Sequence, residues 1–186
     1  MNQQSDKQVR RSLLAALATI LMALSPAFAT TTAASKAQML ADWQRAKEYT
    51  KEYLDAMPED GYAFQPTPEI RSFAGQMLHI AGANYFFTST ALGTKNPYEG
   101  QDLEKMDNLK SKEAVTKFVM DSYDHVINAI NGMTDEQLAK TVTMFKFEMP
   151  AEQLLTKAHE HQTHHRGQST VYLRMKGVTP PQEKLF

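Results

Sequence analysis

The chain has 186 residues, a formal net charge of −1 at pH 7 and no cysteine. This length predicts a single domain, and the balanced charge excludes the strongly basic surface that nucleic acids or anionic lipids require. The lack of cysteine excludes disulfides, thiol nucleophiles and thiolate ligands, so any metal chemistry has to rest on histidines and carboxylates.

The first 29 residues have the pattern of a signal peptide. Lys7, Arg10 and Arg11 form a basic start, residues 12–25 are apolar, and residues 26–29, Pro-Ala-Phe-Ala, give the small-x-small pattern that signal peptidase cleaves. The apolar run of about 14 residues is too short to cross a bilayer. We therefore expect a cleaved leader over residues 1–29 and a periplasmic or secreted domain over residues 30–186, with no membrane segment after cleavage. Because two arginines precede the apolar run, export by the twin-arginine route or by the general route stays open.

The first half of the mature chain predicts two long helices. Apolar residues spaced by three or four favour a helix over residues 35–57, and Pro58 to Gly61 ends it. An extended link with two prolines follows. The second helix is expected over about residues 70–92, beginning at Thr67-Pro68-Glu69 or capped by Ser72. It is apolar or small on nearly every side, so we expect it to be the most buried of the helices.

The second half predicts two more long helices after a loop over residues 93–107. One spans about residues 111–131, and Thr134 with Gln137 then has the capping-box pattern of a short helical turn. Residues 141–149 are expected to be extended or irregular. Pro150 begins the last helix, which runs to about Lys176 and is ended by Gly177. Four amphipathic helices without a convincing sheet predict an all-α, antiparallel four-helix bundle.

The last helix carries four of the six histidines, and their positions around the helix separate those on its apolar stripe from those off it. At ~100° per residue, His161 and His165 fall within about 40° of the apolar stripe through Leu154. His164 falls on the flank of that stripe, and His159 is expected to face outward. A spacing of four residues brings two imidazoles together on one face, as joint ligation of one metal ion requires. Hydrogen-bonded core histidines and a surface tract that scavenges metal are the alternatives.

A third ligand has to come from another helix, and His79 is the candidate. It lies in the middle of the apolar second helix, and mostly small residues share its face, which leaves room for an ion and a substrate. A structural role for this single histidine is the alternative.

These residues resemble the DinB/YfiT-like superfamily of metal-binding four-helix bundles. The resemblance covers nearly the whole mature chain and is carried by these segments: Leu78-His79-Ile80-Ala81, His161-x-x-x-His165-Arg166-Gly167-Gln168, Tyr172-Leu173-Arg174-x-x-Gly177 and Pro180-Pro181. It implies His79, His161 and His165 as ligands of one ion, with one or more positions left for water. Members of the superfamily include thiol S-transferases and a thiol-dependent maleylpyruvate isomerase. Because this chain is expected to be exported, a thiol cosubstrate is less assured for it.

Two classes of function stay open for an exported protein of this kind. One is a metal-dependent enzyme, of hydrolase or thiol S-transferase type, in which the ion lowers the pKa of bound water toward ~7 or holds a substrate oxygen or thiolate. The other is a non-catalytic bundle whose metal is structural or captures a ligand. We expect a small-molecule substrate or ligand, and a homodimer stays open. Zinc, nickel, manganese and iron all suit a histidine-only site. Candidate contacts around the ion or substrate are these: Arg166, Gln168, Tyr172 and Tyr85.

The sequence does not match the motifs of two common metal sites, those of zinc proteases and of ferritin-like di-iron proteins. The zinc-protease pattern starting at His159-Glu160 needs a second histidine where Thr163 stands. A ferritin-like di-iron site needs inward Glu-x-x-His pairs from two helices, and no convincing pair is present. His125 with Asp121 is expected to lie on a solvated face.

Overall fold

The computed structural model describes residues 26–186, with side chains from Lys36 onward. The predicted leader lies outside the described residues except for residues 26–29, so its cleavage and the export stay predictions. The chain divides into two compact units, Met1–Ala37 and Gln38–Phe186. In the first unit, residues 26–37 form the beginning of helix α2 (Pro26–Ala56). The hydrophobic core lies in the second unit.

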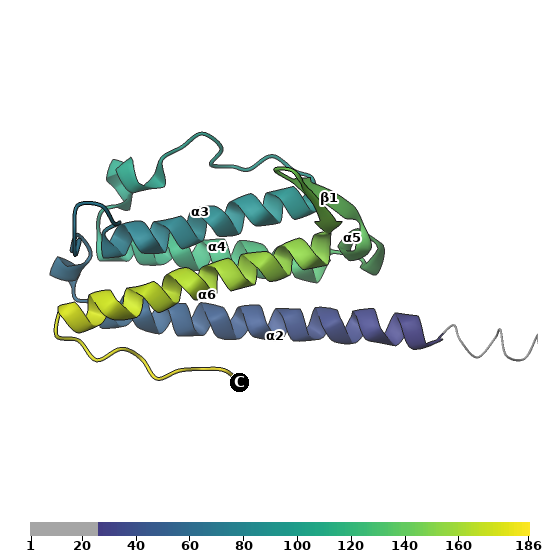
Figure 1. Cartoon of the computed structure of the whole chain (residues 1–186), viewed down its shortest axis with the longest axis horizontal. Coiled ribbons are helices and arrows are strands. Elements are labelled where there is room, and N and C mark those ends of the chain that lie inside the picture. Colours follow the sequence, from purple (N-terminus) through teal and green to yellow (C-terminus); the bar gives the residue numbers. More distant parts are fainter. Residues whose placement is uncertain (1–25) are drawn as a thin grey trace, which may run out of the picture. The chain divides into compact units, whose positions relative to one another are not determined.

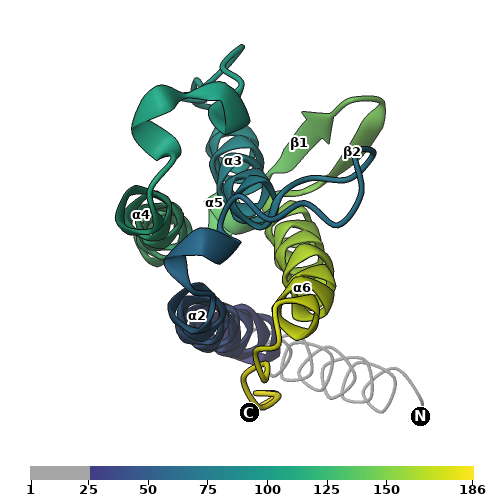
Figure 2. The same cartoon turned by 90° about the vertical axis from the view of Figure 1, so that its left-hand side faces the viewer.

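Four long helices form the second unit (Figures 1 and 2). They are α2 from Gln38, α3 (Phe73–Leu92), α4 (Lys112–Gly132) and α6 (Ala151–Met175). In the end view of Figure 2, α3 lies between α4 and α6, and it packs along both. The predicted all-α class is confirmed. No helix among residues 26–186 has the length and apolar character needed to cross a bilayer.

The helix ends follow from local hydrogen bonds. Ser72 caps α3 by accepting from the Gly75 N–H, which decides between the two predicted starts of this helix. Thr134 and Gln137 form the predicted capping box of the short helix α5 (Asp135–Ala139). Gly93 ends α3 with a φ of 67°, a conformation that favours glycine.

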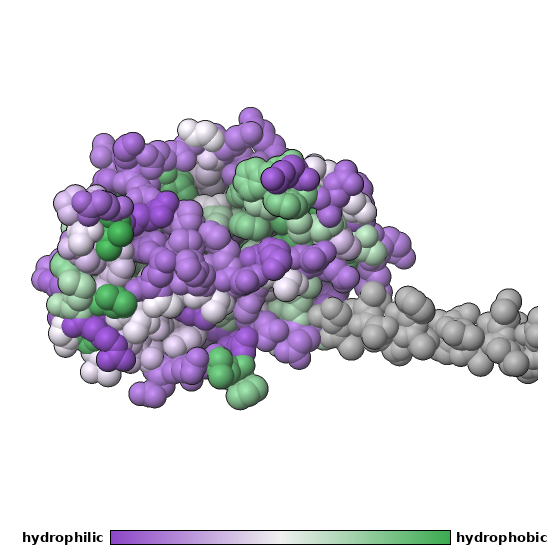
Figure 3. Space-filling model, in the orientation of Figure 1, coloured by the Kyte–Doolittle hydropathy of each residue, from purple (hydrophilic) through white to green (hydrophobic). Residues whose placement is uncertain are grey.

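The connections add short elements that border the site. Three 3-10 turns lie between the long helices: η1 (Glu59–Gly61), η2 (Leu103–Lys105) and η3 (Asp107–Leu109). The segment expected to be extended forms a hairpin of β1 (Thr141–Met144) and β2 (Phe147–Pro150), with Met144 opposite Phe147. Its pairing was not predicted. In Figure 3 apolar side chains gather on the surface where this hairpin lies.

The core lies between the four helices and is rich in aromatic residues. Its largest fully buried side chains include Trp43, Tyr62, Phe73 and Tyr123. Helix α3 is buried along most of its length, as predicted, because α4 and α6 cover two of its sides and the loop before α4 crosses a third. His79, in the middle of α3, is therefore half-buried.

Candidate metal centre

His79 of α3 meets His161 and His165 of α6 where the two helices pack. One ring nitrogen of each residue lies within 4.8 Å of the other two. The ring centroids are 5.0 Å apart for His79 and His161, 4.4 Å for His79 and His165, and 4.5 Å for His161 and His165. The three rings are half-buried. The structure thus brings together the three residues that the sequence singled out, and their geometry suits one ion.

The surroundings keep these imidazoles neutral. Burial, with the charges of Arg71 and His161, lowers the pKa of His79 to about 4. Burial, with the neighbouring histidines, lowers the pKa of His165 to about 4, and burial also lowers the pKa of His161. Each ring therefore has a lone pair available at neutral pH. Nδ1 of His161 is buried and has no hydrogen-bond partner among the described residues, which would be costly unless a bound ion compensates for it.

A chain of glutamines orients His165, and the sequence analysis missed its first member, Gln76. Nδ1 of His165 donates to Oε1 of Gln76 over 3.2 Å, because a carbonyl oxygen can only accept. Nε2 of Gln76 donates to Oε1 of Gln168, whose own Nε2 donates to Nε2 of His164 over 2.9 Å. With its proton fixed on Nδ1, His165 has its Nε2 lone pair free for an ion. A polar residue three positions before His79 in an apolar helix was the signal for Gln76.

Of the four residues predicted to contact the ion or substrate, Gln168 lines the groove beside His165 and belongs to the glutamine chain. Tyr172 is buried and does not line this groove, but its hydroxyl donates over 2.8 Å to the backbone oxygen of Arg71, which does. Tyr85 does not contact the histidines: it packs against Tyr98, Phe118 and His125 between α3 and α4.

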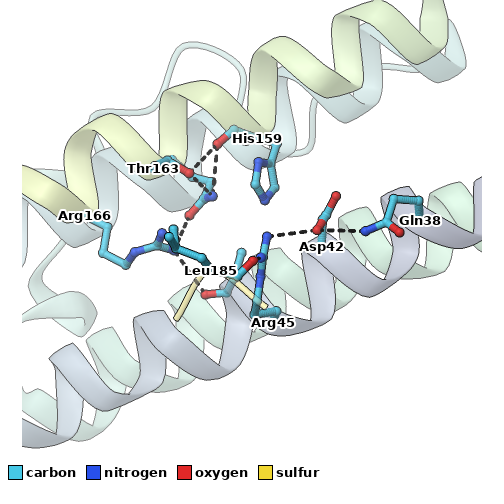
Figure 4. A network of polar contacts seen from close by, with 9 residues as sticks. Gln38, Asp42, Arg45, His159, Thr163, Arg166 and Leu185 are labelled. Carbon is cyan, nitrogen blue, oxygen red and sulfur yellow. Dashed lines mark hydrogen bonds and ion pairs between the residues drawn. The ribbon is translucent and has the colours of Figure 1, made fainter. Parts of the chain in front are cut away.

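Arg166 also points away from the three histidines, toward α2 (Figure 4). Its guanidinium lies 4.4 Å from the ring centre of Tyr49 and donates to Oε1 of Gln162 over 2.9 Å. The residue is buried, and its place directly after His165 turns it about 100° around the helix. The expectation that Arg166 surrounds the ion is therefore wrong.

Two further histidines differ from expectation. His159 does not face outward, because α2 covers that side of α6 and the imidazole packs edge-on against Trp43, with ring centroids 5.4 Å apart. His125 was expected on a solvated face, but it packs 4.9 Å from the Tyr85 ring, and burial lowers its pKa. Neither joins the group of three.

Two grooves adjoin the histidine group. A polar groove of about 890 Å³ reaches His165 and is lined by Arg71, Lys110, Gln76 and Gln168 among others. An apolar groove of about 660 Å³ reaches His79 and His161 and includes these side chains: Phe86, Phe87, Leu103, Met144 and Phe145. Leu78 and Glu104 line both.

The loop between α3 and α4 forms the wall common to both grooves. Arg71 Nε pairs with Glu104 Oε1 over 2.7 Å. Gly75 leaves room for the Glu104 carboxylate beside α3, since a Cβ atom at residue 75 would lie 2.8 Å from Oε2 of Glu104. The site therefore has walls from α3, α6, the hairpin and this loop.

Comparison with known proteins agrees with this architecture. The sequence model of the DinB family matches residues 28–185. YrdA of Bacillus subtilis is 26% identical over 148 residues, which are 76% of this chain and 83% of YrdA. A DinB-like protein of Bacillus cereus has 25% identity and a TM-score of 0.67, covering 78% of this chain and 95% of that one. The structure of YjoA from Bacillus subtilis shares the fold at 21% identity, with a TM-score of 0.62 over 80% of this chain and 96% of YjoA. With its family match over nearly all the described residues, this chain belongs to the DinB family.

Proposed function

We propose that this DinB-family protein binds one divalent metal ion through His79, His161 and His165 and acts as a metal-dependent enzyme on a small molecule. The observation that carries the proposal is the convergence of three neutral imidazoles from two helices at a point that two grooves reach. Within the described residues, no fourth histidine or carboxylate joins the group. A catalytic site of three protein ligands leaves a coordination position for a substrate, whereas structural sites are closed.

The protein residues have separate tasks in this proposal. Gln76 fixes the tautomer and orientation of His165. Arg71 and Lys110 lie in the polar groove beside Glu69 and Glu104, whose charges balance theirs, so this groove favours a strongly polar part of a substrate. When bound, a divalent ion held by three neutral imidazoles keeps its double charge and supplies Lewis-acid catalysis.

Export is part of the proposal and rests on the leader pattern in residues 1–29. A periplasmic or secreted location favours hydrolysis over thiol transfer, since low-molecular-weight thiols are less assured outside the cytoplasm. The competing function is a non-catalytic bundle in which the ion stabilises the fold or captures a ligand.

Elemental analysis of the protein purified from its native host would identify the ion. The protein loaded with zinc, nickel, manganese or iron would then be screened against esters, amides and thiol–electrophile pairs. We expect turnover by the loaded protein, loss of it in His165→Ala, and retention of it in His164→Ala, the adjacent exposed histidine. One bound ion without turnover of any substrate class would favour the non-catalytic function, and no stoichiometric ion would refute both.

A further inference from the structure

The turn of the β hairpin holds a phenylalanine in a conformation that favours glycine. Phe145 and Lys146 are the two residues between the paired Met144 and Phe147. Phe145 has a φ of 56°, and among the described residues it is the one non-glycine with a positive φ. In two-residue hairpins with a positive φ at the first turn position, that position is usually glycine. A bulky side chain there strains the backbone.

The contacts of the Phe145 side chain in the folded protein do not offset this strain. The Phe145 side chain is 81% exposed, so it contributes little apolar burial to the folded state. Its ring contact is with Phe86, at 5.9 Å between centroids, and Phe86 is itself 36% exposed. A glycine or asparagine would form the same turn with less strain. The stability of the hairpin therefore does not explain why the turn has an aromatic residue.

The location of Phe145 offers an explanation. Phe145 lines the apolar groove, and His79 and His161 line the same groove. A volume of about 660 Å³ lies within the usual range for small-molecule sites. Strained residues cluster where a protein binds or positions ligands, because function retains a conformation that stability alone would remove.

We propose that the apolar groove is the subsite for an aryl or alkyl portion of the substrate, and that Phe145 is its specificity-determining residue. The inference rests on the proposed function, because the polar end of such a molecule would reach the ion held by the three histidines. The apolar end would then lie against the rings of Phe145 and Phe86, which line the groove from the hairpin and from α3. The substrate class is a small amphiphile with a metal-coordinating head and an apolar tail.

The first test measures binding to the zinc-loaded protein by calorimetry with two hydroxamates that share the chelating head. Acetohydroxamate lacks a tail, and 4-phenylbutanehydroxamate carries one. In Phe145→Gly we expect affinity for the phenylbutyl probe to fall about tenfold, because an aromatic contact is lost, and affinity for acetohydroxamate to stay within about twofold. Phe147→Thr, which changes an exposed aromatic residue of the same hairpin that does not line the groove, should leave both affinities within about twofold.

Thermal unfolding separates a ligand-binding role from a structural one. Phe145→Gly should keep or raise the Tm, since strain at a positive φ is removed. A fall of more than about 3 °C would show that the ring is retained for stability and would overturn the proposal. Unchanged affinity of this variant for the phenylbutyl probe would overturn it as well.

A second measurement tests ligand binding in the apolar groove separately from metal binding by the three histidines. In metal-free protein labelled at its methionine methyl groups, 4-phenylbutanol should shift the NMR signal of Met144, which lines the groove, and leave buried Met57 unchanged. If the protein binds no ion but Met144 responds, the proposed function fails and the apolar subsite stands. If the protein binds an ion but Met144 does not respond, the subsite is wrong. A Met144 signal that shifts with protein concentration or with phosphatidylcholine vesicles, and not with the probe, would assign the surface to a second copy or to a lipid surface instead.

Discussion

Replacing Gln76 by alanine tests whether the histidine group is built to hold an ion. Gln76 is 5% exposed and accepts from Nδ1 of His165 while donating to Gln168. Alanine removes both hydrogen bonds without changing any of the three histidines. His165 then has no partner that fixes its proton on Nδ1, so a fraction of the molecules presents Nε2 protonated and unable to bind an ion. Affinity should fall, but one-to-one binding should remain.

The size of the loss follows from the position of Gln76, one hydrogen bond away from a ligand. Removal of such a partner weakens metal binding about 10- to 100-fold, which corresponds to about 1.4–2.7 kcal/mol. Gln168→Ala is the matched control, because it removes a bond one step farther from His165. It loses the hydrogen bonds with Gln76 and His164 but none with the three histidines, so binding should weaken only about two- to fivefold. Gln76→Glu should bind at least as tightly as the parent protein, since a carboxylate accepts more strongly from Nδ1.

Zinc affinity would be measured at pH 7.5 by competition with a chromophoric chelator, after removal of all metal by dialysis. Thermal unfolding of each metal-free variant would show that the fold is retained. The reasoning is refuted if Gln76→Ala binds zinc within about twofold of the parent protein, or if Gln168→Ala loses as much affinity as Gln76→Ala.

Three more predictions follow from the same geometry. His161→Ala and His165→Ala should abolish one-to-one metal binding in a titration followed by elemental analysis, whereas the exposed His164→Ala should retain it; equal behaviour of the three would contradict the phase argument. Removal of the ion by EDTA should lower the Tm, and zinc at 100 times its Kd should restore about 2.7 kcal/mol or about 5–10 °C, so a Tm insensitive to zinc would count against a folded-state site. Arg166→Lys should lower the free energy of unfolding in urea by about 1–2 kcal/mol, because the guanidinium no longer stacks on Tyr49. Its zinc affinity should be unchanged, and weaker zinc binding would show that Arg166 contributes to the metal centre.

Local sequence patterns predict the long helices and the inward direction of two candidate ligands, His161 and His165. Apolar spacing is a property of each helix alone, so the four long helices and the pairing of His161 with His165 were predictable from sequence. The third candidate ligand, His79, was identified from its unusual place in an apolar helix and from a family resemblance. The contact of His79 with α6 is tertiary, and spacing along one helix cannot reveal it.

The errors on α6 have one physical cause. The sequence analysis assumed that this helix has one buried face, centred on Leu154. In the bundle α6 is covered by α3 on one side and by α2 on another, so two faces are buried. His159 and Arg166 lie at about 140° and 120° from Leu154, and both point toward α2. A helix in a four-helix bundle needs a wider apolar arc than the single stripe assumed from sequence.

The burial that removes protons from the histidine group also prepares it for an ion. A proton adds one bond to one imidazole and leaves a charge in a partly desolvated site near Arg71, which is why the pKa of His79 falls to about 4. A divalent ion held by all three rings would gain three bonds in compensation for its desolvation. If the proposed site binds an ion, protons would therefore compete only weakly with it at neutral pH. The ion pair of Arg71 with Glu104 reduces a nearby positive charge that would oppose the ion.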